Sequence, residues 1–314
     1  MSQQVETMPN SSLMDGGKKE ITMRKEASNF NPNHGLRKFK EACFHGIICL
    51  ATLSALGVLF ILVFRIFNEG WTWLDAQFLD SFPSRFPHKA GIKSAIWGSI
   101  WLGGMTLLFS VTFGVGAAIY LEELSPKNRI NKWLEINIAT LAGVPSIIYG
   151  MLGLTIFVRF MALERSVVSG ALTLSLLVMP VIIIATREAL KSVPDSTRFG
   201  AAALGASKWQ SVRDHVLPSA FPGILTGIIL AMARAAGEAA PLIMIGALTY
   251  VAFTPEGPMD AFTALPIQIF NWTSRPQIEF HELAAAGIIV LLGFLIVCNS
   301  LAIILRLKWK EEKR

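Results

Sequence analysis

Two ionisable residues, Arg234 and Glu238, lie inside the apolar stretch Ser219–Gly246. Because they are four residues apart, a helix through this stretch places both on one face. A charged residue inside a membrane helix is costly and normally faces the bundle interior or a water-filled path. The planar guanidinium of arginine donates two parallel hydrogen bonds, which suits phosphate-type anions. The pattern therefore predicts that Arg234 offers a positive site on a translocation path.

Glu238 has a less direct role in this interpretation. Its carboxylate would repel a free anion, so we expect it to position Arg234 or to pair with a basic group across a subunit interface. An internal ion pair that only holds the helices together is the alternative, and the sequence leaves it open. Gly237 and the alanines around it are expected to allow close helix packing.

The rest of the chain has the composition of a helical membrane protein. Of its 314 residues, 53% are hydrophobic and only 16% are charged, whereas about a quarter of the residues in soluble domains are charged. Prolines 145, 180 and 222 fall in or at the edge of apolar stretches, where neighbouring helices or water can satisfy the freed carbonyl groups. Six stretches are long enough to span a bilayer: Phe44–Phe64, Ser94–Leu121, Ile136–Val158, Ser166–Thr186, Ser219–Gly246 and Leu283–Leu305.

These stretches predict an all-α integral membrane protein with six transmembrane helices. Residues 1–43 are rich in polar residues and are expected to form a disordered tail. A first transmembrane helix at 44–67 precedes a core of five transmembrane helices at 92–305. Residues 306–314 form a short second tail.

The distribution of lysine and arginine predicts the orientation. The tail, loops 122–135 and 187–215 and the C-terminus together hold 20 of the 28 basic residues, whereas the alternate loops hold 6. Because basic loops stay in the cytoplasm, both termini and the segment 187–215 are expected to face inward. This asymmetry also accounts for the net charge of +6 without a nucleic-acid partner.

The inward segment 187–215 reads as two short helices that meet at a glycine. Pro194 is expected to end one helix, and Asp195 or Ser196 to cap the next. Gly205 then breaks the run.

A second short helix is expected to begin directly after this glycine. Ser207 and Gln210 are three residues apart, which is the spacing of a capping box. Small side chains before it leave room for another protein to approach closely: Gly200, Ala201, Ala202, Ala203 and Gly205.

The order of these features resembles the "EAA" coupling loop of ABC importer permeases. An alanine-rich turn is followed by Gly205, Ala206-Ser207, Trp209 and Leu217-Pro218. The family's glutamate, six residues before the glycine, is Phe199 here, which puts any contact of that carboxylate in doubt. The resemblance implies that an ATPase subunit contacts Gly200, Ala201, Ala202, Gly205, Ala206, Ser207 and Trp209.

Further stretches resemble the PstA-type permeases of phosphate importers. The runs RAAGEAAPL (234–242) and IFNWTSRP (269–276) are the most specific, and similar runs cover most of residues 92–305. The resemblance implies the type I ABC importer permease architecture in a bacterial inner membrane. It also implies a phosphate importer with a PstC-like permease, two PstB-like ATPases and a PstS-like extracytoplasmic phosphate-binding protein.

The resemblance implies that ATP and magnesium bind to the ATPase partners and that this chain is not an enzyme. In agreement, the sequence contains no G-x-x-x-x-G-K-[ST] phosphate loop. No residues have metal-ligand spacing, so no metal site or other cofactor is expected. Two alternatives remain open: a permease for another oxyanion such as sulfate or molybdate, and an ATP-independent channel or scaffold. A channel or scaffold would need no ATPase partner.

Overall fold

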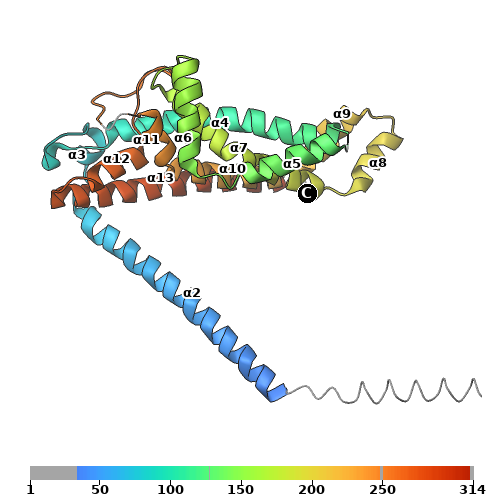
Figure 1. The fold of residues 1–314 in the computed structure, drawn as a ribbon, viewed down its shortest axis with the longest axis horizontal. Helices are drawn as coiled ribbons and strands as arrows, with labels where there is room; N and C mark the ends of the chain where they lie inside the picture. Colours follow the sequence, from blue (N-terminus) through green and yellow to red (C-terminus); the bar gives the residue numbers. More distant parts are fainter. Residues whose placement is uncertain (1–33, 127, 248–249, 312–314) are drawn as a thin grey trace, which may run out of the picture. The chain divides into compact units, whose positions relative to one another are not determined.

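The computed structural model describes residues 34–126, 128–247 and 250–311 (Figure 1). Across these ranges the only β pairing is one isolated bridge between Ser166 and Ala261, so the all-α prediction is confirmed. The α-helices are α2 (His34–Gly70), α3 (Ala76–Asp80), α4 (Lys93–Ile119), α5 (Arg129–Leu141), α6 (Ser146–Gly153), α7 (Val167–Lys191), α8 (Asp195–Ala203), α9 (Lys208–Ser211), α10 (Leu217–Gly237), α11 (Ala240–Ile245), α12 (Leu265–Thr273) and α13 (Ile278–Glu311). Shorter segments are the 3-10 turns η1 (Trp71–Trp73) and η2 (Pro87–Lys89) and the π-helical segments η3 (Tyr120–Leu124), η4 (Leu154–Phe160) and η5 (Val212–Val216).

The chain divides into two units, Met1–Val63 and Phe64–Arg314. We call the second the larger unit; it holds the end of α2 and every later element. Most of the predicted disordered tail, residues 1–33, lies outside the described residues, and helix α2 already begins at His34. At the other end, α13 continues to Glu311, so the predicted second tail is largely a continuation of the helix.

Five described helices are long and apolar enough to cross a membrane, and a bent pair makes a sixth. The bent pair occupies the predicted span Ile136–Val158, where we expected one helix; α5 and the α6–η4 helix instead meet at 104° (Figure 1). Pro145 explains the bend because its ring has no N–H and clashes with the carbonyl four residues earlier. That residue is Leu141, the last of α5, and its carbonyl accepts the Tyr149 hydroxyl at 2.8 Å.

The predicted fifth span is also broken. Helix α10 ends at Gly237, and the short helix α11 begins at Ala240. Pro241 lies four residues after Gly237, so it cannot donate the backbone hydrogen bond that would continue α10. Gly246 ends α11 with a left-handed backbone, φ 81°.

Helix α7 is the centre of the larger unit, since 67% of its apolar stretch is buried. Its main neighbours are α4 and α10. On α10, Gly223 and Gly227 face α7, where an added Cβ would meet Ala189 or Ala185. This pair of small residues four apart permits the close approach of the two helices. Gly237 makes no such close approach within this chain, since a Cβ there would meet nothing within 4 Å, whereas its neighbour Ala235 is buried against other helices.

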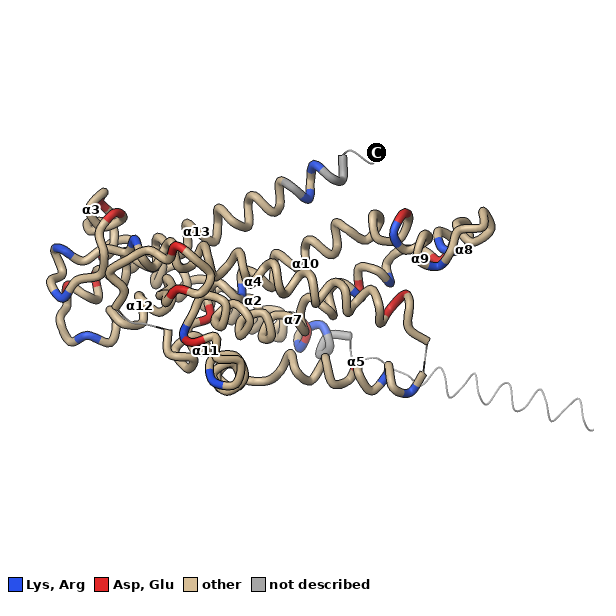
Figure 2. The backbone as a smooth tube through the Cα atoms, turned by 90° about the horizontal axis from the view of Figure 1, so that it is seen from above, with Lys and Arg blue, Asp and Glu red and all other residues tan. Residues whose placement is uncertain are grey.

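The larger unit has two distinct ends. At one end α3, α12 and the start of α13 surround a core that contains Phe78, Trp272 and Phe280. The helices α8 and α9 lie at the opposite end (Figure 1). Charged residues gather toward these ends and are sparse between them (Figure 2). This is the arrangement expected when the middle of a helical bundle lies in hydrocarbon.

Candidate functional site

The predicted coupling segment forms two short helices that meet at a glycine, as expected. Gly205 joins α8 to α9 with φ +82°, a left-handed conformation that costs other residues about 1–2 kcal/mol. The predicted capping box is confirmed. The Ser207 backbone N–H donates to Gln210 Oε1 at 2.8 Å, and the Gln210 backbone N–H donates to Ser207 Oγ at 3.3 Å.

The start of α8 differs from the prediction. Pro194 occupies the position before the helix, and neither Asp195 nor Ser196 makes a capping hydrogen bond. Asp195 is already the first helical residue, so its carboxylate is past the cap position. Asp195 Oδ1 instead accepts a hydrogen bond from Arg198 Nη1 at 3.2 Å.

The coupling segment exposes more apolar surface than the sequence indicated. Leu204 is 89% exposed and Phe199 is 72% exposed, and both lie on α8 or directly after it. Sequence reasoning passed over Leu204, although an apolar residue beside Gly205 in a charged segment is a usable signal. Of the residues predicted to contact an ATPase, Gly200, Ala202, Gly205, Ser207 and Trp209 are exposed, Ala206 is half-buried and Ala201 is buried.

Arg198 ties α8 to the end of α4. Its Nη2 and Nε donate to the Glu123 carboxylate at 2.5 and 3.2 Å. It also donates to the carbonyls of Leu190 and Val193, at 3.0 and 2.8 Å. Hydrogen bonding to Glu123 raises the pKa of Arg198 above its ordinary value, so the arginine stays charged. The side chains of Arg198 and Glu123 are 23% and 7% exposed.

Arg187 makes a second link between helices near the same end. It donates to Glu122 Oε2 from Nε at 3.0 Å and to Glu135 Oε1 from Nη2 at 2.6 Å. Since Glu122 follows α4 and Glu135 lies on α5, Arg187 joins three segments. From sequence alone, Arg187 and Arg198 are recognisable only as positive charges on the predicted inner side. Their glutamate partners are 52 to 75 residues away, and no local pattern reveals such pairs.

The structure brings Arg234 and Glu238 together, but not on one continuous helix. Arg234 lies in the last turn of α10, whereas Glu238 follows the end of that helix with an extended backbone. Arg234 Nε and Glu238 Oε1 are 3.5 Å apart, and the side chains are 43% and 20% exposed. An ion pair this open contributes only about 0–1 kcal/mol.

The surroundings of Arg234 place its guanidinium on the surface of this chain. Ala231 and Ala235 are buried in a cluster with Tyr149 of α6 and residues of α7. Arg234 is the exposed neighbour of these two alanines, so a closed path there requires another surface to cover it. The coupling segment is distant from this site, because α10 has 21 residues and is therefore about 30 Å long.

Metal binding is not supported by the described ranges, where no three His, Cys, Asp or Glu residues are placed to hold an ion. The expectation that no metal site exists stays a prediction. The described cysteines Cys43, Cys49 and Cys298 are free thiols.

Comparison with known proteins extends over most of the chain. Residues 110–310 match the family described as binding-protein-dependent transport system inner membrane component. The chain is 31% identical to the phosphate transport system permease protein PstA of Yersinia pestis, over 93% of this chain and 99% of that protein. It is 30% identical to the probable ABC transporter permease protein YqgI of Bacillus subtilis, over 80% of this chain and 89% of that protein.

Solved structures share the fold. A bacterial ABC transporter involved in the import of the acidic polysaccharide alginate has a chain that superimposes with a TM-score of 0.60. The superposition covers 87% of this chain and 99% of that one, at 15% sequence identity. At this identity the likeness shows the fold of an ABC importer permease and nothing about the molecule that is carried.

Proposed function

The chain belongs to the family of binding-protein-dependent transport system inner membrane components, and from this membership we propose that it is a PstA-type permease subunit of an ATP-driven importer of inorganic phosphate. The resemblance to PstA extends over nearly the full length of that relative. The family membership and the apolar helices make it a multi-pass protein of the inner membrane.

The observation that carries the proposal is the state of Arg234. Its side chain is 43% exposed and only loosely paired with Glu238, at 3.5 Å. A guanidinium held this weakly can exchange its carboxylate partner for a phosphate oxygen at little cost. A purely structural ion pair would be expected to have shorter contacts and less exposure.

The exposure of Arg234 also supports a partner permease. Because the guanidinium lies on the surface of this chain, a second, homologous PstC-like subunit would complete the path around it. Two PstB-like ATPases would bind ATP and magnesium, and a PstS-like protein would deliver phosphate. In this proposal the chain has no catalytic activity of its own and binds no cofactor.

Coupling would run through α8 and α9. ATP-driven closure of the ATPase pair would displace these helices, which expose Leu204 and Phe199. Arg198 would pass the displacement to the end of α4 through Glu123, and Arg187 would pass it from α7 to α5. The spans would then alternate between outward and inward access.

The proposal also specifies which side of the membrane each loop faces. If α8 and α9 meet the ATPase, they and both termini are cytoplasmic. Reporter fusions after residue 205 and at residue 314 should give the same cytoplasmic signal. A fusion in residues 247–282, one of the alternate loops with few basic residues, should give the opposite signal. Opposite signals from the first two fusions would refute the coupling role.

Phosphate uptake into proteoliposomes that contain the assembled complex tests the proposed function directly. Uptake should require ATP and the phosphate-binding protein, and sulfate and molybdate should not compete. ATP-dependent uptake of sulfate or molybdate in place of phosphate would support a permease for another oxyanion. Uptake without ATP would support a channel.

A further inference from the structure

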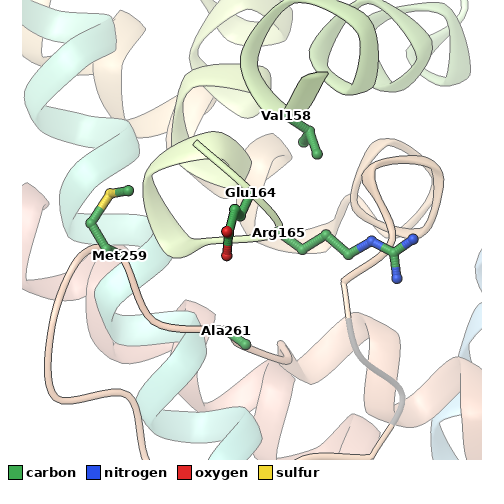
Figure 3. Close-up of a pocket in the computed structure, with 5 residues that line it drawn as sticks. All are labelled: Val158, Glu164, Arg165, Met259 and Ala261. Carbon is green, nitrogen blue, oxygen red and sulfur yellow. The ribbon is translucent and has the colours of Figure 1, made fainter. Parts of the chain in front are cut away.

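A pocket of about 420 Å³ lies beside the start of α7 (Figure 3), whereas α8 and α9 follow the other end of that helix. At about 30 Å³ per water molecule, it has room for on the order of ten waters, or for a small hydrated anion. Nothing in the sequence analysis pointed to it. Its lining residues are Val158, Glu164, Arg165, Met259 and Ala261.

The turn that carries the two charged lining residues has a fixed and unusual backbone. Ala162 and Glu164 have φ of 52° and 54°, a left-handed conformation that is rare for residues other than glycine and costs about 1–2 kcal/mol each. Such strained residues persist only where the surroundings hold them, and they cluster at functional sites. The residues that follow this turn are fixed in place by the bridge between Ser166 and Ala261 and by the capping box of Ser166 with Ser169. Two backbone hydrogen bonds of 3.0 Å add to this, from Val167 N–H to Asp260 O and from Val168 N–H to Pro258 O.

Arg165 is available to a ligand. No hydrogen bond or ion pair joins its side chain to any other residue in the described ranges, whereas Arg187 and Arg198 are each paired with carboxylates. The side chain passes over Gly246, where an added Cβ would lie 2.8 Å from Arg165 Nε. A glycine there therefore leaves the space that the guanidinium needs. Its five N–H donors remain free for an anion.

The carboxylate in the same pocket does not neutralise this arginine. Figure 3 shows Glu164 and Arg165 extending in different directions from the turn. The nearby Asp260 carboxylate is also occupied, since it accepts the backbone N–H groups of Glu256 and Gly257, both at 2.8 Å. The pocket thus presents the N–H donors of the Arg165 guanidinium and the Glu164 carboxylate as an acceptor.

The pocket is close in sequence and space to the Arg234–Glu238 pair. Gly246, against which Arg165 lies, ends α11, and Glu238 lies just before the same helix begins. Helix α11 has six residues and is therefore about 9 Å long. One end of this short helix thus lies against Arg165, and the other follows the Arg234–Glu238 pair.

We propose that the Glu164–Arg165 pocket is a receiving site for inorganic phosphate, from which the anion passes along α11 to Arg234. The inference rests on the proposed function. Both exposed side chains turn toward the bound anion: Arg165 donates hydrogen bonds to the phosphate oxygens, and Glu164 accepts one from the P–OH group that phosphate retains at neutral pH. Sulfate has no proton to donate, so the Glu164 carboxylate repels it. The pocket is therefore a specificity site as well as an entry site.

The first test measures phosphate imported per ATP hydrolysed, in proteoliposomes that contain the full complex and binding protein. Arg165→Gln should lower this ratio roughly tenfold, the loss expected when a charge-assisted hydrogen bond is removed. ATP hydrolysis stimulated by the binding protein should stay within about twofold, because the coupling end is untouched. Arg159→Gln is the matched control, since Arg159 is also exposed and precedes the same turn but does not line the pocket.

A second variant covers the case in which Arg165→Gln fails to assemble. Met259→Glu places another carboxylate in the pocket and should lower the ratio similarly, whereas Met259→Gln should leave it unchanged. If wild type transports phosphate and either Arg165→Gln or Met259→Glu matches its control, the pocket proposal is overturned and the proposed function stands. If wild type fails to transport phosphate, the proposed function itself fails.

The second test addresses selectivity without the binding protein. Radiolabelled phosphate is bound to the nanodisc-embedded complex, with sulfate as competitor. Sulfate should compete at least about tenfold better against Glu164→Gln than against wild type, because the repelling carboxylate is gone. Equal competition in both would remove Glu164 from the site.

Discussion

Two arginine–glutamate pairs in the larger unit differ in contact distance, in the number of hydrogen bonds and in exposure. At the coupling end, Arg198 contacts Glu123 at 2.5 Å and also donates to two backbone carbonyls. At the break between α10 and α11, Arg234 approaches Glu238 only to 3.5 Å and makes no other hydrogen bond or ion pair within the described ranges. The first arginine is 23% exposed and the second 43%.

This difference is the one expected if, as proposed, Arg198 has a mechanical role and Arg234 a ligand-binding role. A buried, multiply bonded pair resists separation, because removing one partner leaves the other charge desolvated. Such a pair can transmit force between α8 and α4. An exposed pair is weak and salt-sensitive, so either member can change partners. That property is useful where an anion must bind and leave.

The largest effect is expected from removing the tight pair. Arg198→Met leaves Glu123 buried without its partner and should destabilise the permease by about 3 kcal/mol, measured by denaturation in detergent. Arg213→Met is the control. The Arg213 side chain is 71% exposed and lies 3.7 Å from Asp214, so its loss should change stability by less than about 0.5 kcal/mol. Equal stability of the two variants would show that the Arg198–Glu123 pair stabilises the permease no more than an exposed pair does.

Removing the loose pair should affect transport rather than stability. The double variant Arg234→Gln, Glu238→Gln should assemble with a stability within about 1 kcal/mol of wild type. Its phosphate uptake should fall roughly 10- to 100-fold, equivalent to a charge-assisted hydrogen bond of about 1.5–3 kcal/mol. Arg234→Lys keeps the charge but loses the planar fork, so it should be partly impaired. Normal uptake by the double variant would make the pair structural.

Substitutions at Gly205 test whether an ATPase docks on the turn between α8 and α9, from which the Arg198–Glu123 pair would receive its displacement. An added side chain at Gly205 meets nothing within 4 Å in this chain, but φ is +82°. Gly205→Ala should therefore cost about 1–2 kcal/mol locally and retain the ATPase. Gly205→Asp adds a charge at the contact, so the permease should insert but no longer co-purify with the ATPase. Full co-purification and uptake by Gly205→Asp would argue against docking at this turn.

The smallest effect is expected from pH. Hydrogen bonding to Glu123 raises the pKa of Arg198, so its stabilising contribution is complete below the arginine's ordinary pKa and is lost only as pH rises through the raised value. Moving from neutral to mildly alkaline pH should therefore leave the wild-type advantage over Arg198→Met unchanged. A decline of that advantage over this range would show that another titrating group maintains the link.

Local sequence patterns predicted the features that depend on near neighbours. The six apolar stretches correspond to the described spans, and the turn at Gly205 and the Ser207–Gln210 capping box formed as expected. Each depends on contacts within a few residues or on the average polarity of a segment. Those properties are readable from the chain itself.

The effect of each proline on its helix could not be predicted from local sequence patterns. Pro145 and Pro241 each follow a helix that ends four residues earlier, whereas α7 continues through Pro180. All three remove the same backbone hydrogen bond. Pro180 lies in a helix whose apolar stretch is 67% buried, whereas α5 has no buried residue. The helix thus continues through Pro180 where neighbouring helices surround it, and their presence is a tertiary property.

The sequence by itself determined the class of protein, the position of the turn at Gly205 and the presence of an arginine in an apolar stretch. The tertiary structure alone decided which arginines are restrained and which are free. Arg198 pairs with a glutamate 75 residues away. Arg165, in the turn before α7, lies against Gly246 at the end of α11 and has no carboxylate partner in the described ranges. Because the strength of a charge pair depends on burial and on partners distant in the chain, only the fold distinguishes a restrained arginine from a free one.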